Sequence, residues 1–231
     1  MKAEILIVDD EQEIADLVAL YLQNEGCRVH VSDTAADALA CVGEKEIDLA
    51  VLDVMLPDMD GFSLCKAIRE RHTFPIIMLT AKVEDMDKLT GLAIGADDYI
   101  TKPFNPLEVV ARAKAQLRRC NQYNGGGGPD HIYDKGGLVV NRDTHECSLY
   151  GKTVSLTPIE FDILWLLCEN GGKVVSAEDI FETVWGEKYL DSNNTVMVHI
   201  RRLREKLNET PRNPKYIKTV WGVGYKIESG R

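Results

Sequence analysis

Five short apolar runs in the first half of the chain, separated by segments with helical spacing, are the feature that most constrains the fold. The first intervening segment, residues 11–23, places Ile14, Leu17 and Tyr21 at the intervals of one helix face. Short strands that alternate with helices are typical of a parallel sheet covered by helices on both faces. The sequence therefore predicts an α/β domain over residues 1–120, with strands at residues 5–8, 27–31, 49–53, 76–80 and 98–101.

Polar residues stand at the carboxyl ends of four of these runs: Asp9 and Asp10, Asp53, Thr80, and Lys102. Because ligands of open α/β sheets bind at this edge, we expect the five side chains to lie close together. Three clustered carboxylates repel one another unless a divalent cation and a lysine neutralise them, and oxygen ligands favour Mg²⁺. A carboxylate beside Mg²⁺ and an ammonium group is suited to attack a phosphoryl group.

The motifs of this domain resemble the receiver domain of two-component response regulators, and they are LIVDDE, VLDVMLPDMDG, PIIMLTA, GADDYITKPF and PLEVVARAKAQLRR. The resemblance implies a flavodoxin-like (βα)5 fold in which a sensor histidine kinase phosphorylates Asp53. It implies that Asp10 and the Met55 carbonyl join Asp53 in binding Mg²⁺. Asp9 would act through water, and Lys102 would contact the phosphoryl group. The peptide bond between Lys102 and Pro103 is expected to be cis.

The same resemblance implies a switch and a dimer interface. Thr80 and Tyr99 would report phosphorylation by moving inward together. Charged positions would then pair across a symmetric homodimer, as Lys88 with Glu108, Asp98 with Arg112, and Asp97 with Arg119. Without the resemblance these charges would be interpreted as solvated helix faces, because exposed ion pairs contribute only about 0–1 kcal/mol each.

Two other functions compete with this interpretation. A phosphatase of the haloacid dehalogenase kind needs a carboxylate two residues after its aspartate nucleophile, and Met55 stands there. We therefore expect no turnover enzyme, although slow autodephosphorylation of Asp53 is compatible with the site. A regulator that works unphosphorylated is the second alternative. The presence of all three acids, together with Thr80 and Lys102, argues against it.

A glycine-rich segment, residues 121–130 (NQYNGGGGPD), predicts a flexible linker to a second domain at residues 131–231. The net charge of the chain is −10, which by itself argues against a nucleic-acid partner. The charge is uneven, however: residues 1–120 hold 13 basic and 22 acidic residues, whereas residues 193–226 hold eight basic and two acidic residues. This local positive charge predicts a polyanionic partner.

The second domain is predicted to contain a small antiparallel sheet, three helices and a C-terminal hairpin. Thr157, Pro158 and Glu160 form the signature of a capping box at the first helix, and Ser176 is expected to cap the second. The third helix, near residues 194–207, has a predicted buried stripe of Val196, Ile200, Leu203 and Leu207. Its opposite face and flanks carry Val198, Arg201, Arg202, Glu205, His199, Arg204 and Lys206.

A cationic helix face with one small apolar residue suits the major groove of duplex DNA, although a solvated basic face is the alternative. LTPIEFDILWLLCENGGKVVS, NNTVMVHIRRLREKL and YIKTVWGVGYKI resemble the winged helix-turn-helix effector domain of OmpR/PhoB-type regulators. The resemblance implies binding to promoter DNA, transcriptional activation and contact with RNA polymerase. The expected DNA contacts are Asn194, Thr195, Val198, His199, Arg201, Arg202, Arg204, Lys218 and Trp221.

Trp221 departs from the family pattern, which often has arginine at the wing tip for the minor groove, so this side chain is expected to pack or to stack on sugar instead.

Longer segments such as EIADLVALYLQNEG and NPKYIKTVWGVGYKIE are most similar to VanR-type regulators of vancomycin resistance. The six cysteines lie at least 14 residues apart, and no run approaches 18 apolar residues. We therefore expect reduced cysteines, no membrane segment and a cytoplasmic protein.

Overall fold

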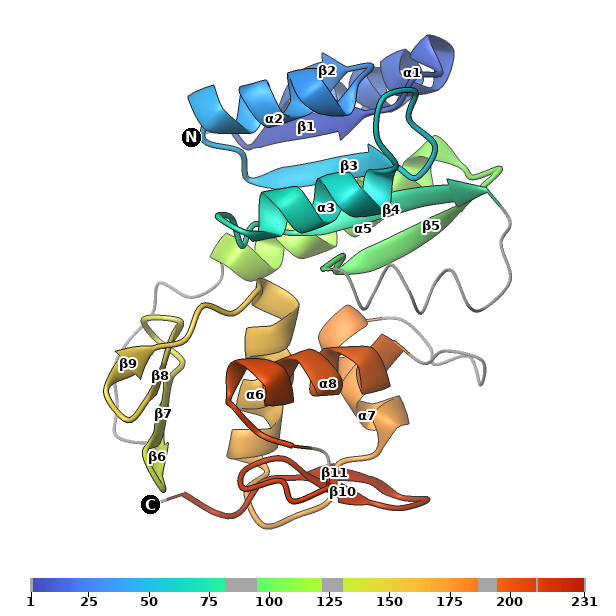
Figure 1. Ribbon diagram of the computed structural model, residues 1–231. Coiled ribbons are helices and arrows are strands. Elements are labelled where there is room, and N and C mark those ends of the chain that lie inside the picture. Colours follow the sequence, from blue (N-terminus) through green and yellow to red (C-terminus); the bar gives the residue numbers. More distant parts are fainter. Residues whose placement is uncertain (1, 82–94, 122–130, 187–194, 211, 231) are drawn as a thin grey trace. The chain divides into compact units, whose positions relative to one another are not determined.

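The computed structural model describes residues 2–81, 95–121, 131–186, 195–210 and 212–230, without the side chains of residues 119–121. Contacts divide the chain into two compact units, residues 1–119 and 120–231 (Figure 1). The predicted linker lies almost entirely outside the described residues. No described helix is long and apolar enough to cross a membrane.

The first unit is built on a five-stranded sheet in the order β2-β1-β3-β4-β5, in which all neighbouring strands are parallel (Figure 1). The strands are β1 (Glu4–Val8), β2 (Arg28–Ser32), β3 (Leu49–Asp53), β4 (Ile76–Ala81) and β5 (Asp98–Lys102). The helices are α1 (Gln12–Asn24), α2 (Ala35–Glu44), α3 (Gly61–Arg69) and α5 (Pro106–Asn121). The predicted alternation of strands and helices is confirmed for the described residues, whereas the segment between β4 and β5 at residues 82–94 lies outside them.

Two apolar cores lie on the two faces of this sheet. Ile5 and Ile7 of β1 pack in the core with α1 and α5, whereas Leu6 and Val8 pack in the core with α2 and α3. Side chains alternate between faces along a strand, so a strand covered on both sides must be apolar at every position. This requirement explains the uninterrupted apolar runs in β1, β3 and β4, whereas the edge strands β2 and β5 also contain polar residues.

The loop between β3 and α3 is tied to the start of α2. Asp58 accepts hydrogen bonds from the Ala35 and Ala36 amides, at 2.9 and 3.0 Å, and the first of these bonds lowers the pKa of Asp58. Asp60 caps α3 by accepting from the Ser63 amide at 2.9 Å. These carboxylates satisfy amides that a helix start leaves without partners, and they fix the loop that follows Asp53.

The second unit combines two antiparallel sheets with three helices. The first sheet contains β6 (Ile132–Lys135), β7 (Leu138–Asn141), β8 (Glu146–Leu149) and β9 (Lys152–Thr153). The helices are α6 (Pro158–Glu169), α7 (Ala177–Trp185) and α8 (Thr195–Lys206), and the C-terminal hairpin pairs β10 (Lys218–Val220) with β11 (Gly224–Lys226). One apolar core joins the three helices to the sheet and the hairpin.

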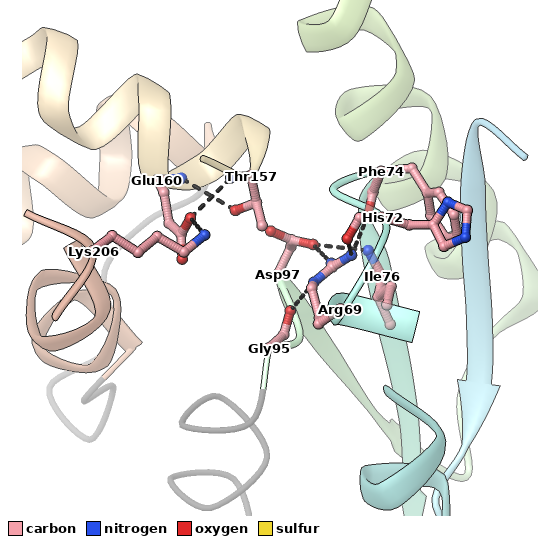
Figure 2. A network of polar contacts seen from close by, with 9 residues as sticks. All are labelled: Arg69, His72, Phe74, Ile76, Gly95, Asp97, Thr157, Glu160 and Lys206. Atoms are coloured by element: carbon pink, nitrogen blue, oxygen red, sulfur yellow. Dashed lines mark hydrogen bonds and ion pairs between the residues drawn. The ribbon is translucent and has the colours of Figure 1, made fainter. Parts of the chain in front are cut away.

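The predicted helix caps of this unit are confirmed. Thr157 and Glu160 form a capping box, in which the Glu160 carboxylate accepts from the Thr157 amide at 2.8 Å (Figure 2). Ser176 caps α7 by accepting from the Asp179 amide at 2.9 Å. Lys206, expected on a flank of the third helix, donates to Glu160 at 2.6 Å (Figure 2). It therefore joins the end of α8 to the start of α6.

Candidate functional site

An acidic cluster forms where β1 and β3 end. One ligand oxygen from each of Asp9, Asp10 and Asp53 lies within 4.8 Å of the others, with Asp9 and Asp53 buried and Asp10 exposed. The two Asp9 oxygens accept from the Glu11 amide and from the Lys102 ammonium, each at 2.9 Å. The protein thus holds Asp9 from two sides and leaves Asp10 open to solvent.

Lys102 reaches this cluster from the end of β5. Its ammonium group lies 2.9 Å from Asp9, 3.2 Å from Asp53 and 3.0 Å from Glu11, which the sequence did not predict as a partner. Burial favours the neutral amine, but the hydrogen bonds to Asp9 and Glu11 and the charge of Asp53 raise the pKa of Lys102 above its usual value. Lys102 is therefore a permanent positive charge. Its bond to Pro103 is cis, as expected.

The Asp53 carboxylate is held in a mildly unfavourable environment. Burial, followed by the charge of Asp9, raises the pKa of Asp53, and the Lys102 ammonium and the Met55 amide only partly oppose the shift. A divalent cation shared by Asp10 and Asp53 would relieve this repulsion. Carboxylate and carbonyl oxygens are the ligands that Mg²⁺ prefers, so the residues fit that metal.

In the second unit, α8 packs its apolar stripe against the domain. Val196, Ile200, Leu203 and Leu207 all belong to the apolar core, as predicted. On the outer face Arg201 is exposed and pairs with Glu205 at 3.0 Å. Lys218 on β10 is half-exposed and pairs with Glu228 at 2.6 Å. Trp221 stands at the tip of the β10–β11 hairpin with 91% of its surface exposed.

Arg204 and His199, which were predicted to lie on the flanks of α8 and to contact DNA, are both buried. Arg204 is buried and donates to the Ile217 carbonyl at 2.7 and 3.2 Å and to the Thr219 hydroxyl at 2.8 Å. The Arg204 guanidinium therefore binds the strand that leads into the hairpin, because the Ile217 carbonyl there needs a hydrogen-bond donor. His199 is buried with its ring 5.4 Å from that of Trp185.

Other expected DNA contacts are less exposed than predicted. Val198 and Arg202 lie opposite the core stripe on α8 but are largely covered, although Val198 is not part of the apolar core. Thr195, the first residue of α8, is also buried. Asn194 lies outside the described residues. Arg201, Lys218 and Trp221 are the predicted contacts that the structure presents most openly.

Two family models match the chain: the response regulator receiver domain at residues 5–114, and the C-terminal domain of transcriptional regulatory proteins at residues 151–227. The chain is 61% identical to regulatory protein VanRc of Enterococcus gallinarum and 60% identical to VanR of Enterococcus faecium. Each alignment covers 99% of this chain and 100% of the relative. The chain belongs to the OmpR/PhoB-type response regulators.

Two solved structures are similar to the whole chain. DrrB of Thermotoga maritima, an OmpR/PhoB homologue, is 38% identical with a TM-score of 0.53, and a mutant of RitR is 30% identical with a TM-score of 0.76. Both alignments cover 99% of this chain and 100% of the other. The acidic cluster thus lies in a receiver domain, and α8 with its hairpin lies in a winged-helix DNA-binding domain.

The two predicted switch residues of the regulator share one face of the receiver sheet. Thr80 is buried near the end of β4 and donates to the Ala81 carbonyl at 3.0 Å. Tyr99 on β5 pairs in register with Met78 and packs against the core under α2 and α3. Thr80 is two residues beyond Met78, so its side chain points to the same face as that of Tyr99.

Several charges predicted to pair across a dimer make contacts inside one chain. Arg112 of α5 lies 3.0 Å from Asp98 and 3.1 Å from Glu108. Asp97 binds Arg69, at the end of α3, at 2.6 Å and accepts from the Ile76 amide at 2.8 Å (Figure 2). Lys88 and the Arg119 side chain lie outside what the structure describes. The dimer pairing therefore stays a prediction.

Gly61 is a site residue that the sequence analysis missed. A Cβ atom at this position would lie 1.9 Å from the Asp53 carbonyl oxygen, and the Gly61 amide donates to the Val54 carbonyl at 2.8 Å. Only glycine lets the start of α3 approach the Asp53 backbone so closely. The available signal was the glycine that ends VLDVMLPDMDG.

We expect Gly61→Ala to disturb the phosphorylation site while Gly43→Ala, in α2, does not. The Gly61 methyl group must push the Asp53 backbone aside, which lowers the free energy of unfolding by roughly 1–3 kcal/mol. It slows phosphoryl labelling by about tenfold to a hundredfold, since misplacing a reacting group by about 1 Å has such effects. A Cβ at Gly43 meets nothing within 4 Å, so that variant is the matched control. Equal labelling rates in the two variants would contradict the assignment.

Proposed function

We propose that a sensor histidine kinase transfers a phosphoryl group to Asp53 of this regulator, which then dimerises and binds promoter DNA to activate transcription in the cytoplasm. The observation that carries the proposal is the cluster in which a buried carboxylate, Asp53, lies 3.2 Å from Lys102 and beside two further acids. The charges of this cluster are arranged as phosphoryl transfer requires.

In the proposed transfer an Asp53 oxygen attacks phosphorus and displaces the imidazole nitrogen of a phosphohistidine, so that a P–O bond replaces the P–N bond. Mg²⁺ held by Asp10, Asp53 and the Met55 carbonyl would neutralise charge on the phosphoryl oxygens. The Lys102 ammonium is positioned to contact another of those oxygens, and Asp9 orients Lys102 through their 2.9 Å contact. The phosphoryl group then adds about −1.5 to −2 charges at Asp53, to which the switch residues Thr80 and Tyr99 would respond.

The same site argues against turnover of external phosphate esters. A general acid two residues beyond the nucleophile would have to be Met55, whose side chain is exposed and cannot donate a proton. The acyl phosphate would therefore be lost only by slow attack of water. We propose that Asp53 is the input of a switch and not the nucleophile of a phosphatase.

For the output we propose a homodimer formed through Asp98, Glu108 and Arg112, with Lys88, Asp97 and Arg119 as further members. In it, Arg112 would exchange its contacts within the chain for contacts with the partner. DNA would be contacted by the outer face of α8 and by Lys218 and Trp221 of the hairpin. Because the chain is about 60% identical to two VanR proteins, we propose vancomycin-resistance genes as its targets and RNA polymerase as a partner.

The proposed function is tested by removing either the phosphodonor or the metal. We expect full-length protein given acetyl phosphate and Mg²⁺ to sediment as a dimer and to bind fragments of its own genome at least tenfold more tightly than protein without the donor. Adding EDTA before the donor should abolish both effects, because the carboxylates then lack their cation. Equal dimerisation and DNA affinity in all three samples would refute phosphorylation control.

A further inference from the structure

Asp58 is a carboxylate near the phosphorylation site that takes no part in the phosphoryl transfer described above. It lies in the β3–α3 loop, residues 54–60, and its two oxygens accept from the Ala35 and Ala36 amides at 2.9 and 3.0 Å. Together with its own amide and that of Met59, these donors lower the pKa of Asp58, the Ala35 amide most. The side chain is therefore ionised and bound, although the residue is exposed.

The start of α2 needs this carboxylate. The first amides of a helix have no partner within the helix, and its N-terminus favours a negative charge. Thr34 serves one of these amides by accepting from Asp37 at 3.2 Å. Asp58 serves the amides of Ala35 and Ala36, the first two residues of α2, from a segment more than 20 residues further along the chain. The helix and the loop therefore hold each other.

Other contacts of the loop hold its two ends. The Gly61 amide donates to the Val54 carbonyl at 2.8 Å, which closes the loop at its base. Asp60, the last loop residue, accepts from the Ser63 amide of α3 at 2.9 Å. Between these two points Asp58 ties the loop to a separate helix. The path of the chain through the middle of the loop thus depends on the contact with α2.

The expected metal-binding carbonyl lies in this part of the loop, three residues before Asp58. The Met55 amide donates to the Asp53 carboxylate, and the Met55 carbonyl is the expected ligand of Mg²⁺. The Met55 side chain is 69% exposed, so packing of that side chain does not hold the residue in place. Because a peptide unit is planar, the carbonyl turns whenever the backbone at residues 55–56 turns. Its direction therefore depends on how the loop is held on either side.

We propose that Asp58 is a positioning residue for the magnesium site, which keeps the Met55 carbonyl in place for the cation by binding the start of α2. This inference rests on the proposed phosphorylation of Asp53. Asp58 itself is not a ligand in it, since both of its oxygens already accept amides and the acidic cluster consists of Asp9, Asp10 and Asp53. The contact also couples α2 to the phosphorylation site.

The first test measures the affinity of the full-length, unphosphorylated protein for Mg²⁺ by isothermal titration calorimetry. We expect Asp58→Ala to weaken binding about tenfold, because losing a group that orients a metal ligand typically costs about 10- to 100-fold. Asp58→Asn should lose about threefold, since its amide oxygen still accepts one hydrogen bond. It carries the test if Asp58→Ala fails to fold, as judged by circular dichroism.

Asp37→Asn is the matched control for this titration. Asp37 is also an exposed carboxylate at the start of α2, but its side chain accepts from the Thr34 hydroxyl, at 2.9 Å, and not from the loop. The variant loses the same charge as Asp58→Asn and should bind Mg²⁺ as wild type does.

The second test measures phosphoryl labelling by acetyl phosphate over a range of Mg²⁺ concentrations. We expect Asp58→Ala to need about tenfold more Mg²⁺ for half of its maximal rate. The maximal rate itself should match that of wild type, because Asp58 does not touch the reacting atoms. A reduced maximal rate that excess Mg²⁺ does not restore would contradict a role in holding a metal ligand.

The outcomes separate this inference from the proposed function. Wild-type protein that binds no Mg²⁺ would refute the proposed metal site. Wild-type protein that binds Mg²⁺ no more tightly than Asp58→Ala would overturn only the role of Asp58. Equal losses in Asp58→Ala and Asp58→Asn, or an equal loss in Asp37→Asn, would assign the effect to negative charge near the site and would also overturn that role.

Discussion

Asp53→Asn is expected to abolish phosphoryl labelling of the protein by acetyl phosphate or by a phosphorylated histidine kinase. The amide has no anionic oxygen to attack phosphorus, and it removes one ligand of the proposed Mg²⁺ site. Phosphorylation-dependent dimerisation and DNA binding should be lost with the label. The measurement is incorporation of ³²P by full-length protein in the presence of Mg²⁺.

Asp16→Asn is the matched control, because Asp16 is an exposed carboxylate on α1 whose only described contact is with Gln12 at 2.9 Å. It should label at the wild-type rate. Label that persists in Asp53→Asn would show that another carboxylate accepts the phosphoryl group. Asp10 is the obvious competitor, since it is exposed in the same cluster.

Arg69→Met is expected to lower the free energy of unfolding by about 3–5 kcal/mol, more than any other variant considered. Arg69 joins the end of α3 to two neighbouring segments by donating to the Gly95 and Phe74 carbonyls, at 2.8 and 2.7 Å, and to the Asp97 carboxylate at 2.6 Å (Figure 2). Removing the guanidinium leaves a buried carboxylate and two carbonyls without this donor. Urea denaturation followed by circular dichroism measures the loss.

Arg28→Met is the control for that experiment. Arg28 also pairs with a carboxylate, Glu4, but its side chain is 64% exposed, so water and salt screen the pair. We expect it to lower the unfolding free energy by no more than about 1 kcal/mol. Similar losses in both variants would show that burial of the Arg69–Asp97 pair contributes nothing.

The Arg69–Asp97 pair also bears on the proposed dimer. Asp97 was predicted to bind Arg119 of a partner, and in the single chain one of its oxygens is bound by Arg69 and by the Ile76 amide. Arg69 therefore orients Asp97 at the start of β5. In the same way, Arg112 holds Asp98 and Glu108 within the chain, so its participation in a dimer would require the exchange of these two ion pairs.

Much of the architecture was predictable because it depends on patterns between residues close in sequence. Uninterrupted apolar runs specify strands covered on both faces, and the spacing of Thr157, Pro158 and Glu160 specifies a capping box. The buried stripe of α8 followed from 100° per residue alone. For Asp9, Asp53 and Lys102 only the shared edge of the sheet was predictable, because parallel strands must end at one edge.

The binding partners of the α8 side chains could not be predicted from such local patterns. Helical geometry placed Arg204 on a flank of α8, where a free guanidinium would reach phosphate. In the structure the Arg204 guanidinium instead donates to the Ile217 carbonyl, 13 residues further along the chain, at 2.7 Å. The position of a residue on a helix depends on local sequence, but its partner depends on which segment packs there.

The sequence by itself determined the strand and helix order, the caps and the residue types of the phosphoryl site, since each of these follows from local periodicity and chemistry. Only the tertiary structure decided that Gly61 must lack a side chain beside Asp53, that Arg69 holds Asp97, and that Arg204 binds the strand that leads into the hairpin. Those properties depend on distances between segments far apart in the chain. Such distances are set by how the helices and strands pack together.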